Sequence, residues 1–305
     1  MSSIVYRNIF SMGTRLDIVL PGVTEDLGDV VFQKITRELN RLEEKISIYK
    51  ETSDFSIINH NAFEKPQKSH QEIFILVEKL LDLSQMTKGY FDFTMGHVLI
   101  NQNKNIVPTE AEVIYETNSG SCKDKIQLDH DNKTIAFNHK LVALDSGGFG
   151  KGLGLDAVKT ILIEHDIEMA FVNFGSSSVY AHGHHPFGDS WKTGICNIFK
   201  ETENAFVFDL QNEAMSVSGN NPQNIKKHGT GHIINPFSGK PVEGYFQCAV
   251  SGENGLITEV ISTALSCAPP GQRDEIMSNF PLYKAVIIQY EKSNEPIITY
   301  SSNIK

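Results

Sequence analysis

Two stretches of the chain combine residue types that bind phosphate or a hard cation. The first is LDSGGFGKGLGLD, residues 144–156, which holds five glycines, two acids and one lysine. Glycine lets a ligand approach main-chain N–H groups closely, so the run is typical of a nucleotide or phosphate cradle. In the second stretch, Glu259 and Thr263 are four residues apart. On a helix they face the same way and offer the oxygen ligands that Mg²⁺ prefers.

The glycine run fits neither of two common nucleotide-binding patterns. A Walker A loop needs a glycine and a Ser or Thr where this chain has Asp145 and Gly152. A dinucleotide fingerprint fits only as Gly152-x-Gly154-x-x-Ala157, and residues 172–175 lack the acid that it requires. Each stretch also has an alternative without a ligand. Residues 144–156 could form a glycine-rich turn that binds nothing, and Glu259 and Thr263 could form a hydrogen bond on a solvated helix face.

Composition bounds the class of protein. The chain has 305 residues, of which 40% are hydrophobic and 21% charged, as in ordinary globular domains. The formal net charge of -10 and the lack of a basic run argue against nucleic acid or an anionic membrane as partner. The first twenty residues resemble neither a signal peptide nor a lipidation site, and no segment reaches transmembrane length, so we expect a cytoplasmic protein without membrane insertion. The four cysteines are scattered, which predicts unpaired thiols.

Hydrophobic periodicity predicts the N-terminal elements. Alternation over residues 4–20 predicts a strand interrupted at 11–14. Apolar residues at 31, 35, 39, 42 and 46 predict one buried helix stripe, with the helix ending near Tyr49. A capping box, Ser69-x-x-Glu72, predicts the start of a second helix that stops with Gly89 at its C′ position.

The rest of the chain alternates further strands and helices. The patterns predict a short helix at Pro108-Thr109-Glu110, a hairpin over 126–137, a helix over 155–163, a strand over 169–173, two strands within 192–218, a polar loop over 226–245, a helix over 256–267 and a hairpin over 285–300. No repeat or linker divides the chain. We therefore expect an α+β fold, with antiparallel or mixed sheets packed against helices, as a single domain over residues 1–305.

The order of these segments resembles that of a known family, the ApbE-type flavin transferases, or FAD:protein FMN transferases. The resemblance covers nearly the whole chain and lies in seven short motifs. These are Met12-Gly13-Thr14, Ser47-Ile48-Tyr49 with Ser53 to Asn59, Tyr90-Phe91-Asp92-Phe93-Thr94, Asp145 to Gly152, Val172-Asn173-Phe174-Gly175, His232 to Gly239, and Glu259 to Leu265.

The resemblance implies a role for particular residues. It implies FAD as substrate and Mg²⁺ as cofactor. The implied catalytic residues are Asp145, Lys151 and His232. The implied FAD-binding residues are Met12, Tyr49, Tyr90, Phe91, Asp92, Asp145, Lys151, His232 and Ile234. The implied metal ligands are the Gly148 carbonyl, Glu259, Ser262 and Thr263.

The function implied is Mg²⁺-dependent transfer of FMN from FAD to a Thr or Ser hydroxyl of an acceptor protein with an Asp-x-x-Thr-like motif, with AMP as leaving group. Alternatives are an FAD pyrophosphatase that uses water and a non-catalytic FAD-binding protein. The chain departs from the family pattern at three places. Glu259 and Asn235 stand where Asp is usual, and residues 175–178 form a serine-rich loop. The longer Glu259 side chain predicts a Mg²⁺ site of lower affinity.

Overall fold

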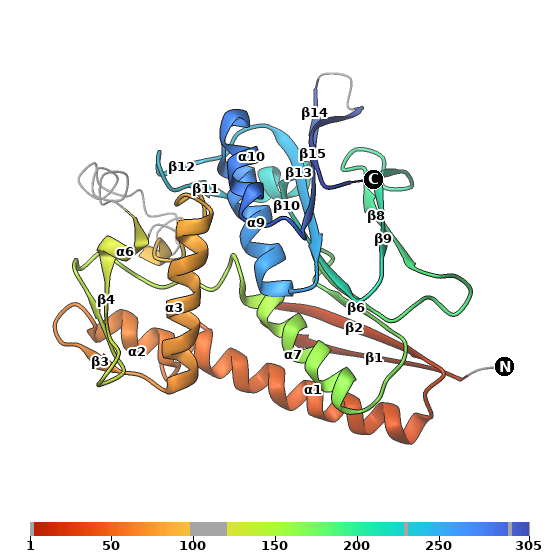
Figure 1. Cartoon of the computed structure of the whole chain (residues 1–305), viewed down its shortest axis with the longest axis horizontal. Helices are drawn as coiled ribbons and strands as arrows, with labels where there is room; N and C mark the ends of the chain where they lie inside the picture. The colour runs from red at the N-terminus through yellow and green to blue at the C-terminus, as the bar shows by residue number, and fades with distance from the viewer. Residues whose placement is uncertain (1–2, 98–120, 229–230, 292–294, 305) are drawn as a thin grey trace.

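The fold is built on one long antiparallel sheet. The computed structural model describes residues 3–97, 121–228, 231–291 and 295–304, so the helix expected at Pro108-Thr109-Glu110 lies outside the described residues. Every neighbouring strand pair of the sheet is antiparallel, which confirms the predicted fold class (Figure 1). Within the described ranges the sheet has eight strands, in the order β1 (Ile4–Ser11), β2 (Thr14–Pro21), β6 (Ala170–Phe174), β7 (Ser178–His182), β10 (Glu213–Asn220), β13 (Tyr245–Gly252), β14 (Lys284–Tyr290) and β15 (Pro296–Ser302).

Helices α1 (Glu25–Ile46), α7 (Gly150–Glu164) and α9 (Gly255–Cys267) pack on one face of this sheet (Figure 1). The predicted apolar stripe of α1 is buried, since Val31, Ile35 and Leu39 are fully enclosed against β1 and β2. The helix ends at Ile46, three residues before the predicted end. The periodicity of the sequence therefore located this helix and its buried face correctly.

A separate hairpin covers the opposite face of the sheet. It consists of β8 (Trp191–Cys196) and β9 (Asn204–Leu210). Successive residues of β14 point to opposite faces of the sheet. Ala285 and Ile287 pack in the hydrophobic cluster on the helical face, and Val286 and Ile288 pack in the cluster under the hairpin. Both faces of the central strands are therefore buried, as the period of two requires.

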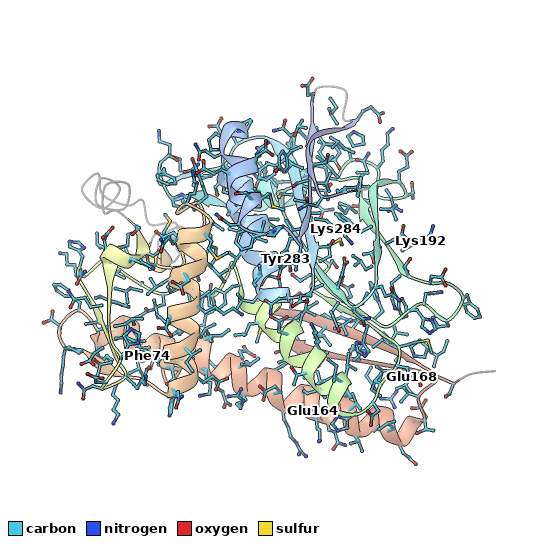
Figure 2. The ribbon with its side chains drawn as sticks, viewed as in Figure 1. Phe74, Glu164, Glu168, Lys192, Tyr283 and Lys284 are labelled. Atoms are coloured by element: carbon cyan, nitrogen blue, oxygen red, sulfur yellow. The ribbon has the colours of Figure 1, made fainter. Side chains whose placement is uncertain are left out.

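A smaller layer lies beyond the C-terminal end of α1 (Figure 1). It contains α2 (Asp54–Asn61), α3 (Gln71–Met86), α6 (Cys122–Lys125) and a sheet in the order β3 (Gln67–Lys68), β5 (Thr134–Phe137), β4 (Ile126–Asp129). Its apolar residues join those of α9 and α10 (Pro270–Ser278) in one cluster, which extends from Phe74 on α3 to Tyr283 near the centre of the molecule (Figure 2). The other described elements are α8 (Pro222–His228), β11 (Ile234–Asn235) and β12 (Lys240–Pro241). In the described parts of the chain, no helix has the length and apolar character needed to cross a membrane.

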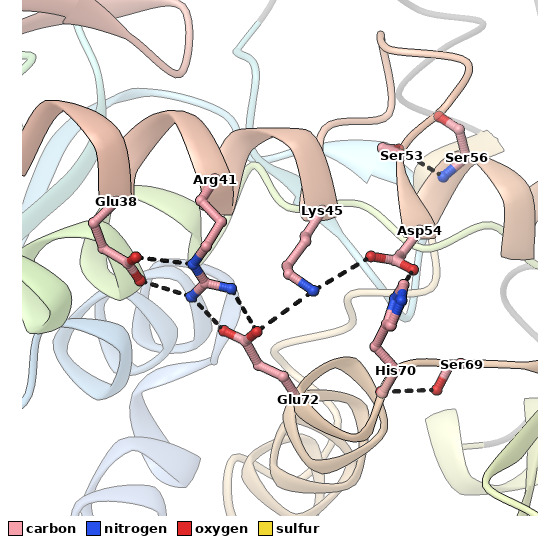
Figure 3. A network of polar contacts seen from close by, with 9 residues as sticks. All are labelled: Glu38, Arg41, Lys45, Ser53, Asp54, Ser56, Ser69, His70 and Glu72. Carbon is pink, nitrogen blue, oxygen red and sulfur yellow. Dashed lines mark hydrogen bonds and ion pairs between the residues drawn. The ribbon is translucent and has the colours of Figure 1, made fainter.

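The N-terminus of α3 lacks the predicted capping box. His70, not Ser69, is the N-cap residue, and it makes no side-chain capping bond. Glu72 instead accepts a hydrogen bond from Arg41 on α1 at 2.6 Å and lies 3.5 Å from the Lys45 ammonium (Figure 3). The hydrogen bond from Arg41 holds the pKa of Glu72 below its ordinary value. The Glu72 carboxylate therefore binds Arg41 and Lys45 of α1 and not the backbone N–H group at the start of α3.

The C-terminus of α3 also differs from the prediction. Lys88 occupies the C′ position with φ +56, and Gly89, with φ +78, follows it. The Gly89 N–H donates to the Ser84 carbonyl at 2.8 Å and the Lys88 N–H to the Gln85 carbonyl at 2.9 Å. This pair of bonds is a Schellman motif, so Gly89 belongs to the cap but lies one residue later than predicted.

Other segment boundaries were wrong where turns or short strands gave little signal. The first predicted strand is a hairpin whose turn residues, Met12 and Gly13, both have positive φ. The region 192–218 contains β8, β9 and most of β10 rather than two strands, and the predicted loop 226–245 contains β11 and β12. A non-glycine turn residue and two-residue strands carry no periodic signal that would reveal them.

The four cysteines are free thiols, as their spacing predicted. Cys122, Cys248 and Cys267 are buried, whereas Cys196 is exposed. Burial raises the pKa of Cys248 and of Cys267 to about 12, so these two thiols stay protonated at neutral pH.

Helices α7 and α9 cross in direct backbone contact. A Cβ atom on Gly152 would lie 2.2 Å from the Gly255 carbonyl oxygen, and one on Gly255 would lie 2.6 Å from the Gly152 carbonyl oxygen. Asp156 on α7 accepts hydrogen bonds from the backbone N–H groups of Gly255 (2.6 Å) and Leu256 (3.0 Å), so it caps α9 from the neighbouring helix. Burial raises the pKa of this carboxyl. Glycine at position 152 therefore serves helix packing, a role that the sequence pattern did not indicate.

We predict that Gly152→Ala lowers the free energy of unfolding by at least about 2 kcal/mol, because the added methyl group forces the two helices apart. Gly271→Ala on α10 is the matched control, since a Cβ there meets no atom within 4 Å and its φ is not positive. The control should be neutral or slightly stabilising. Urea unfolding of the three proteins measures both changes, and equal midpoints for the two variants would contradict the crossing as described.

Candidate active site

Among the described residues, two adjoining cavities of about 670 Å³ and about 500 Å³ lie beside the N-terminus of α7. Every predicted site residue except Ser262 lines at least one of them. The residues that line both are Tyr49, Asp145, Gly147, Lys151, Gly175 and Ser177. The larger cavity adds Tyr90, Phe91, Asp92, Gly148, His232, Ile234, Glu259 and Thr263, and the smaller adds Met12. The fold thus brings together residues from both ends of the chain.

Lys151 lies in the first turn of α7, because this helix begins at Gly150, five residues before the predicted start. Its ammonium forms an ion pair with the Glu259 carboxylate on α9. The lysine side chain is 23% exposed, whereas that of Glu259 is only 4% exposed. Replacing Lys151 would therefore leave a buried carboxylate without its cation, so its role is not confined to ligand binding.

Both oxygens of the Glu259 carboxylate have protein partners. Oε2 accepts a hydrogen bond from the Gly152 N–H at 2.7 Å. Oε1 accepts one from the Ser178 hydroxyl at 3.3 Å and also contacts the Lys151 ammonium. These contacts come from α7 and β7, so they fix the carboxylate at the wall of the larger cavity.

Thr263 follows Glu259 by one helical turn and lines the same cavity, as its spacing predicted. A Cβ on Gly148 would lie 3.7 Å from Thr263 Oγ1, so the main chain of Gly148 runs beside this hydroxyl. Ser262 faces β10 instead, where its hydroxyl lies 2.8 Å from Ser218 Oγ and donates to the Glu259 carbonyl at 3.0 Å. Ser218 lines the larger cavity and also lies 3.4 Å from Thr263 Oγ1, so Ser262 reaches the site through Ser218, and its assignment as a metal ligand stays a prediction.

Asp145 is positioned by backbone pairing with the segment that carries the aromatic residues. Its N–H donates to the Phe93 carbonyl at 2.8 Å, and the Asn59 side chain exchanges hydrogen bonds of 2.7 and 2.9 Å with the backbone of Leu144. Asp145 Oδ2 accepts from the Gly147 N–H at 2.9 Å. Burial raises the pKa of Asp145, against the opposing effects of the Gly147 N–H and the Lys151 charge. Protonation of Asp145 therefore begins at a higher pH than for an exposed aspartate.

Asp92 lines the larger cavity, but its carboxylate is engaged behind the wall. It accepts hydrogen bonds from the Lys125 ammonium at 2.9 Å, the Thr94 N–H at 2.7 Å and the Cys122 thiol at 3.0 Å. The side chains of Asp92 and Lys125 are 6% and 3% exposed. Burial alone would raise the pKa of Asp92, but Lys125 and these donors outweigh it and hold the pKa below its ordinary value. The carboxylate of Asp92 therefore has a structural role, and the FAD contact that the resemblance implies for this residue stays a prediction.

The β11–β12 hairpin forms one rim of the larger cavity. Exposed His232 lies just before it and lines the cavity, and the Phe237 ring packs on that of Tyr90 with centroids 4.8 Å apart. The Asn235 side chain donates to the Cys267 carbonyl at the end of α9 (3.1 Å) and accepts from the Phe237 N–H (2.9 Å). Because the donor in the first bond is an amide, an aspartate at this position could not make it when ionised.

Hairpin turns form the wall of the smaller cavity. Met12 is in the β1–β2 turn, and Gly175 and Ser176 form the β6–β7 turn with φ +68 and +60. A Cβ on Gly175 would lie 2.8 Å from the Thr14 side chain, so the two turns touch. The serine-rich loop that departs from the family pattern is thus a tight turn against β2. Tyr49, 79% exposed, lies at the rim of both cavities.

Comparison with known proteins places this site in a family. The model of the ApbE family matches residues 12–287. The chain belongs to the ApbE family. The FAD:protein FMN transferase of Klebsiella pneumoniae is 24% identical over 88% of this chain and 86% of the relative, and that of Rhodobacter capsulatus is 27% identical over 65% of this chain. The second match spans only 38% of the Rhodobacter protein.

Solved structures agree with the assignment to the ApbE family at the level of fold. The flavin transferase ApbE of Vibrio cholerae has a TM-score of 0.82 and 18% identity, with 99% of this chain and 98% of that chain covered. The ApbE protein of Thermotoga maritima has a TM-score of 0.80 and 21% identity, with 94% of each chain covered. At these identities the likeness concerns the fold alone.

Several residues of this ApbE site escaped the sequence reasoning. Lys125 had no signal, because a single lysine in a polar segment is normally solvated. Asp156 was read as part of a helix, although it caps α9 across the crossing. Ser178 and Ser218, which contact Glu259 and Thr263, lie on neighbouring elements of the sheet side. These two serines are 40 residues apart in the sequence, so no local pattern predicted that they share a wall.

We predict that Asp92→Asn lowers the free energy of unfolding by about 3–5 kcal/mol at pH 7, because it removes the carboxylate that pairs with the buried Lys125 ammonium. Since the folded-state pKa of Asp92 is depressed, its contribution is present above the ordinary value of 3.8 and is lost as the pH falls below it. Urea unfolding between pH 7 and pH 3 should therefore show the gap between variant and wild type narrowing at low pH. The double variant with Lys125→Met should recover most of the loss, and wild-type stability in Asp92→Asn would refute the buried pair.

Proposed function

We propose that this protein transfers FMN from FAD to a Thr or Ser hydroxyl of an acceptor protein and releases AMP, in a reaction that depends on Mg²⁺. The observation that carries the proposal is the meeting of the two cavities at Asp145 and Lys151, beside the oxygen donors of α9. The names of the curated relatives, FAD:protein FMN transferase, agree with it.

The shape of the cavities suits FAD. FAD has two ring systems joined by a pyrophosphate, and two adjoining cavities with a shared polar wall match that division. Each cavity falls within or near the usual volume for small-molecule sites, about 300–1,000 Å³. Tyr90, Phe91 and Ile234 give the larger cavity apolar walls for a ring. The pyrophosphate would then lie at the junction, next to Lys151.

The charge of the walls calls for an additional cation. The acids that line the cavities are Glu43, Asp92, Asp145 and Glu259, against the bases Lys50 and Lys151. Even with Asp92 neutralised by buried Lys125, the walls do not carry the excess of positive charge that an anionic pyrophosphate needs. Binding FAD next to Asp145 therefore favours a site that also takes up a metal ion.

The donors present fit Mg²⁺. Glu259, Thr263 and the main chain of Gly148 converge on the larger cavity and offer carboxylate, hydroxyl and carbonyl oxygens, the ligands of a hard cation. Mg²⁺ is usually held by only one or two carboxylates together with substrate phosphates, so this small set of protein donors suits it. Bound at Glu259 and Thr263, Mg²⁺ would neutralise charge on the phosphates of FAD.

The protein residues then divide the work of transfer. The Lys151 ammonium holds the pyrophosphate, and the backbone of Gly147 and Gly148 lies beside it. His232, at the exposed rim, takes the proton of the acceptor hydroxyl as it attacks. The new bond joins the acceptor oxygen to the FMN phosphorus, the bond from that phosphorus to the bridging oxygen breaks, and AMP leaves with the bridging oxygen.

Hydrolysis of FAD is the second candidate, and the exposure of the rim favours it. Because His232 is exposed, water reaches the position from which an acceptor hydroxyl would attack. The same residues would then release FMN and AMP.

The decisive measurement is AMP release from FAD and Mg²⁺, followed by chromatography. We expect AMP only when a peptide with an Asp-x-x-Thr-like motif is present, together with flavin bound to that peptide. A matched peptide with valine in place of the threonine is the control. AMP release without any peptide would establish the hydrolase instead, and FAD binding without AMP under any condition would refute both enzymatic functions.

We further predict that His232→Ala reduces AMP release in the presence of acceptor peptide by about 100-fold or more, because the hydroxyl loses its general base. The affinity for FAD, measured by flavin fluorescence, should fall by much less than the rate, since the proposal places His232 at the rim of the cavity and away from the phosphates. An unchanged rate would remove His232 from the chemistry, and loss of FAD affinity alone would assign it to binding.

A further inference from the structure

The carboxylate that the proposed function assigns to the metal already has a cation. Lys151 reaches from the first turn of α7 to Glu259 Oε1, while the Gly152 N–H occupies Oε2. Among the described residues that line both cavities, Lys151 is the only cationic one. A single ammonium group therefore stands where two anions, the Glu259 carboxylate and the FAD pyrophosphate, both require positive charge.

We propose that Lys151 is an exchangeable internal cation: it neutralises Glu259 until a divalent cation takes its place, and its ammonium then turns to the FAD pyrophosphate. This inference rests on the proposed function, because it takes Glu259 as a metal ligand and FAD as the anion. It adds that the metal displaces Lys151 from Glu259 and that the FAD pyrophosphate takes up the released ammonium.

Electrostatics explains why the exchange is needed in both directions. A buried carboxylate with no cation is costly, so Glu259 requires Lys151 when no metal is bound. An ammonium and a divalent cation on one carboxylate repel each other, so the metal binds with the lysine withdrawn. The Lys151 side chain is partly exposed and borders both cavities, which gives it a place to go.

The exchange couples the two ligands. Metal binding frees Lys151 for the pyrophosphate, and a pyrophosphate that attracts Lys151 clears Glu259 for the metal. By linkage, each ligand then raises the affinity for the other by the same factor. The protein would thus engage FAD strongly only when the metal is also present.

The test is the affinity for Mn²⁺ alone, with no FAD, followed by the electron paramagnetic resonance signal of the free ion. We expect Lys151→Met to bind Mn²⁺ at least about fivefold more tightly than the wild type, the low end of common coupling factors. Lys159→Met is the matched control: it removes the same charge from the same helix, where the Lys159 ammonium donates to the Glu253 carbonyl and lines neither cavity. Equal or weaker binding by Lys151→Met would overturn the exchange.

Two further measurements keep the result interpretable. If Lys151→Met is unstable without metal, Mn²⁺ should raise its melting temperature more than that of the wild type; an equal rise in the two proteins would overturn the proposal. Glu259→Gln should lose Mn²⁺ binding. If Glu259→Gln binds Mn²⁺ like the wild type, the metal site of the proposed function fails, whereas loss of binding there with no gain in Lys151→Met refutes only the exchange.

Discussion

The backbone contact between α7 and α9 is the constraint on which the site depends. With no side chain at Gly152 or Gly255, the helices approach until the N–H of Gly152 can bond a side chain of the other helix. Asp156 then caps α9 and fixes its rotation and position along its axis. Glu259 and Thr263 face the cavity because α9 is held in this way, and Lys151 meets Glu259 because it directly precedes the crossing residue Gly152 on α7.

Three acids at the site show how neighbours decide what a carboxylate does. Asp92 is paired with buried Lys125, which depresses its pKa, so it stabilises the wall. Asp145 has mainly a backbone N–H for partner, and burial raises its pKa. Glu259 forms an ion pair with Lys151, which borders both cavities. Residue type alone would have treated the three acids alike, whereas their partners differ: a buried lysine for Asp92, a backbone N–H for Asp145 and a partly exposed lysine for Glu259.

The sequence predicted the elements with strong periodicity and the residues inside family motifs. The stripe of α1 and the turn-by-turn relation of Glu259 to Thr263 follow from helix geometry, which needs no distant partner. What failed depended on tertiary neighbours. Glu72 does not form the predicted capping box because it binds Arg41 and Lys45 on another helix. The role of Gly152 depends on its contact with Gly255, about a hundred residues away in the sequence. Such contacts join residues far apart in sequence, where no local pattern records them.

The glutamate at position 259 is part of the helix packing as well as of the site. Its extra methylene, about 1.5 Å of reach, was expected only to weaken a metal site. In the structure this length carries the carboxylate to the Gly152 N–H on the neighbouring helix and to Lys151. An aspartate would withdraw the carboxylate from both partners unless the helices moved. Glu259, Gly152 and Lys151 therefore form one unit, in which the acid joins the helices and the lysine balances its charge.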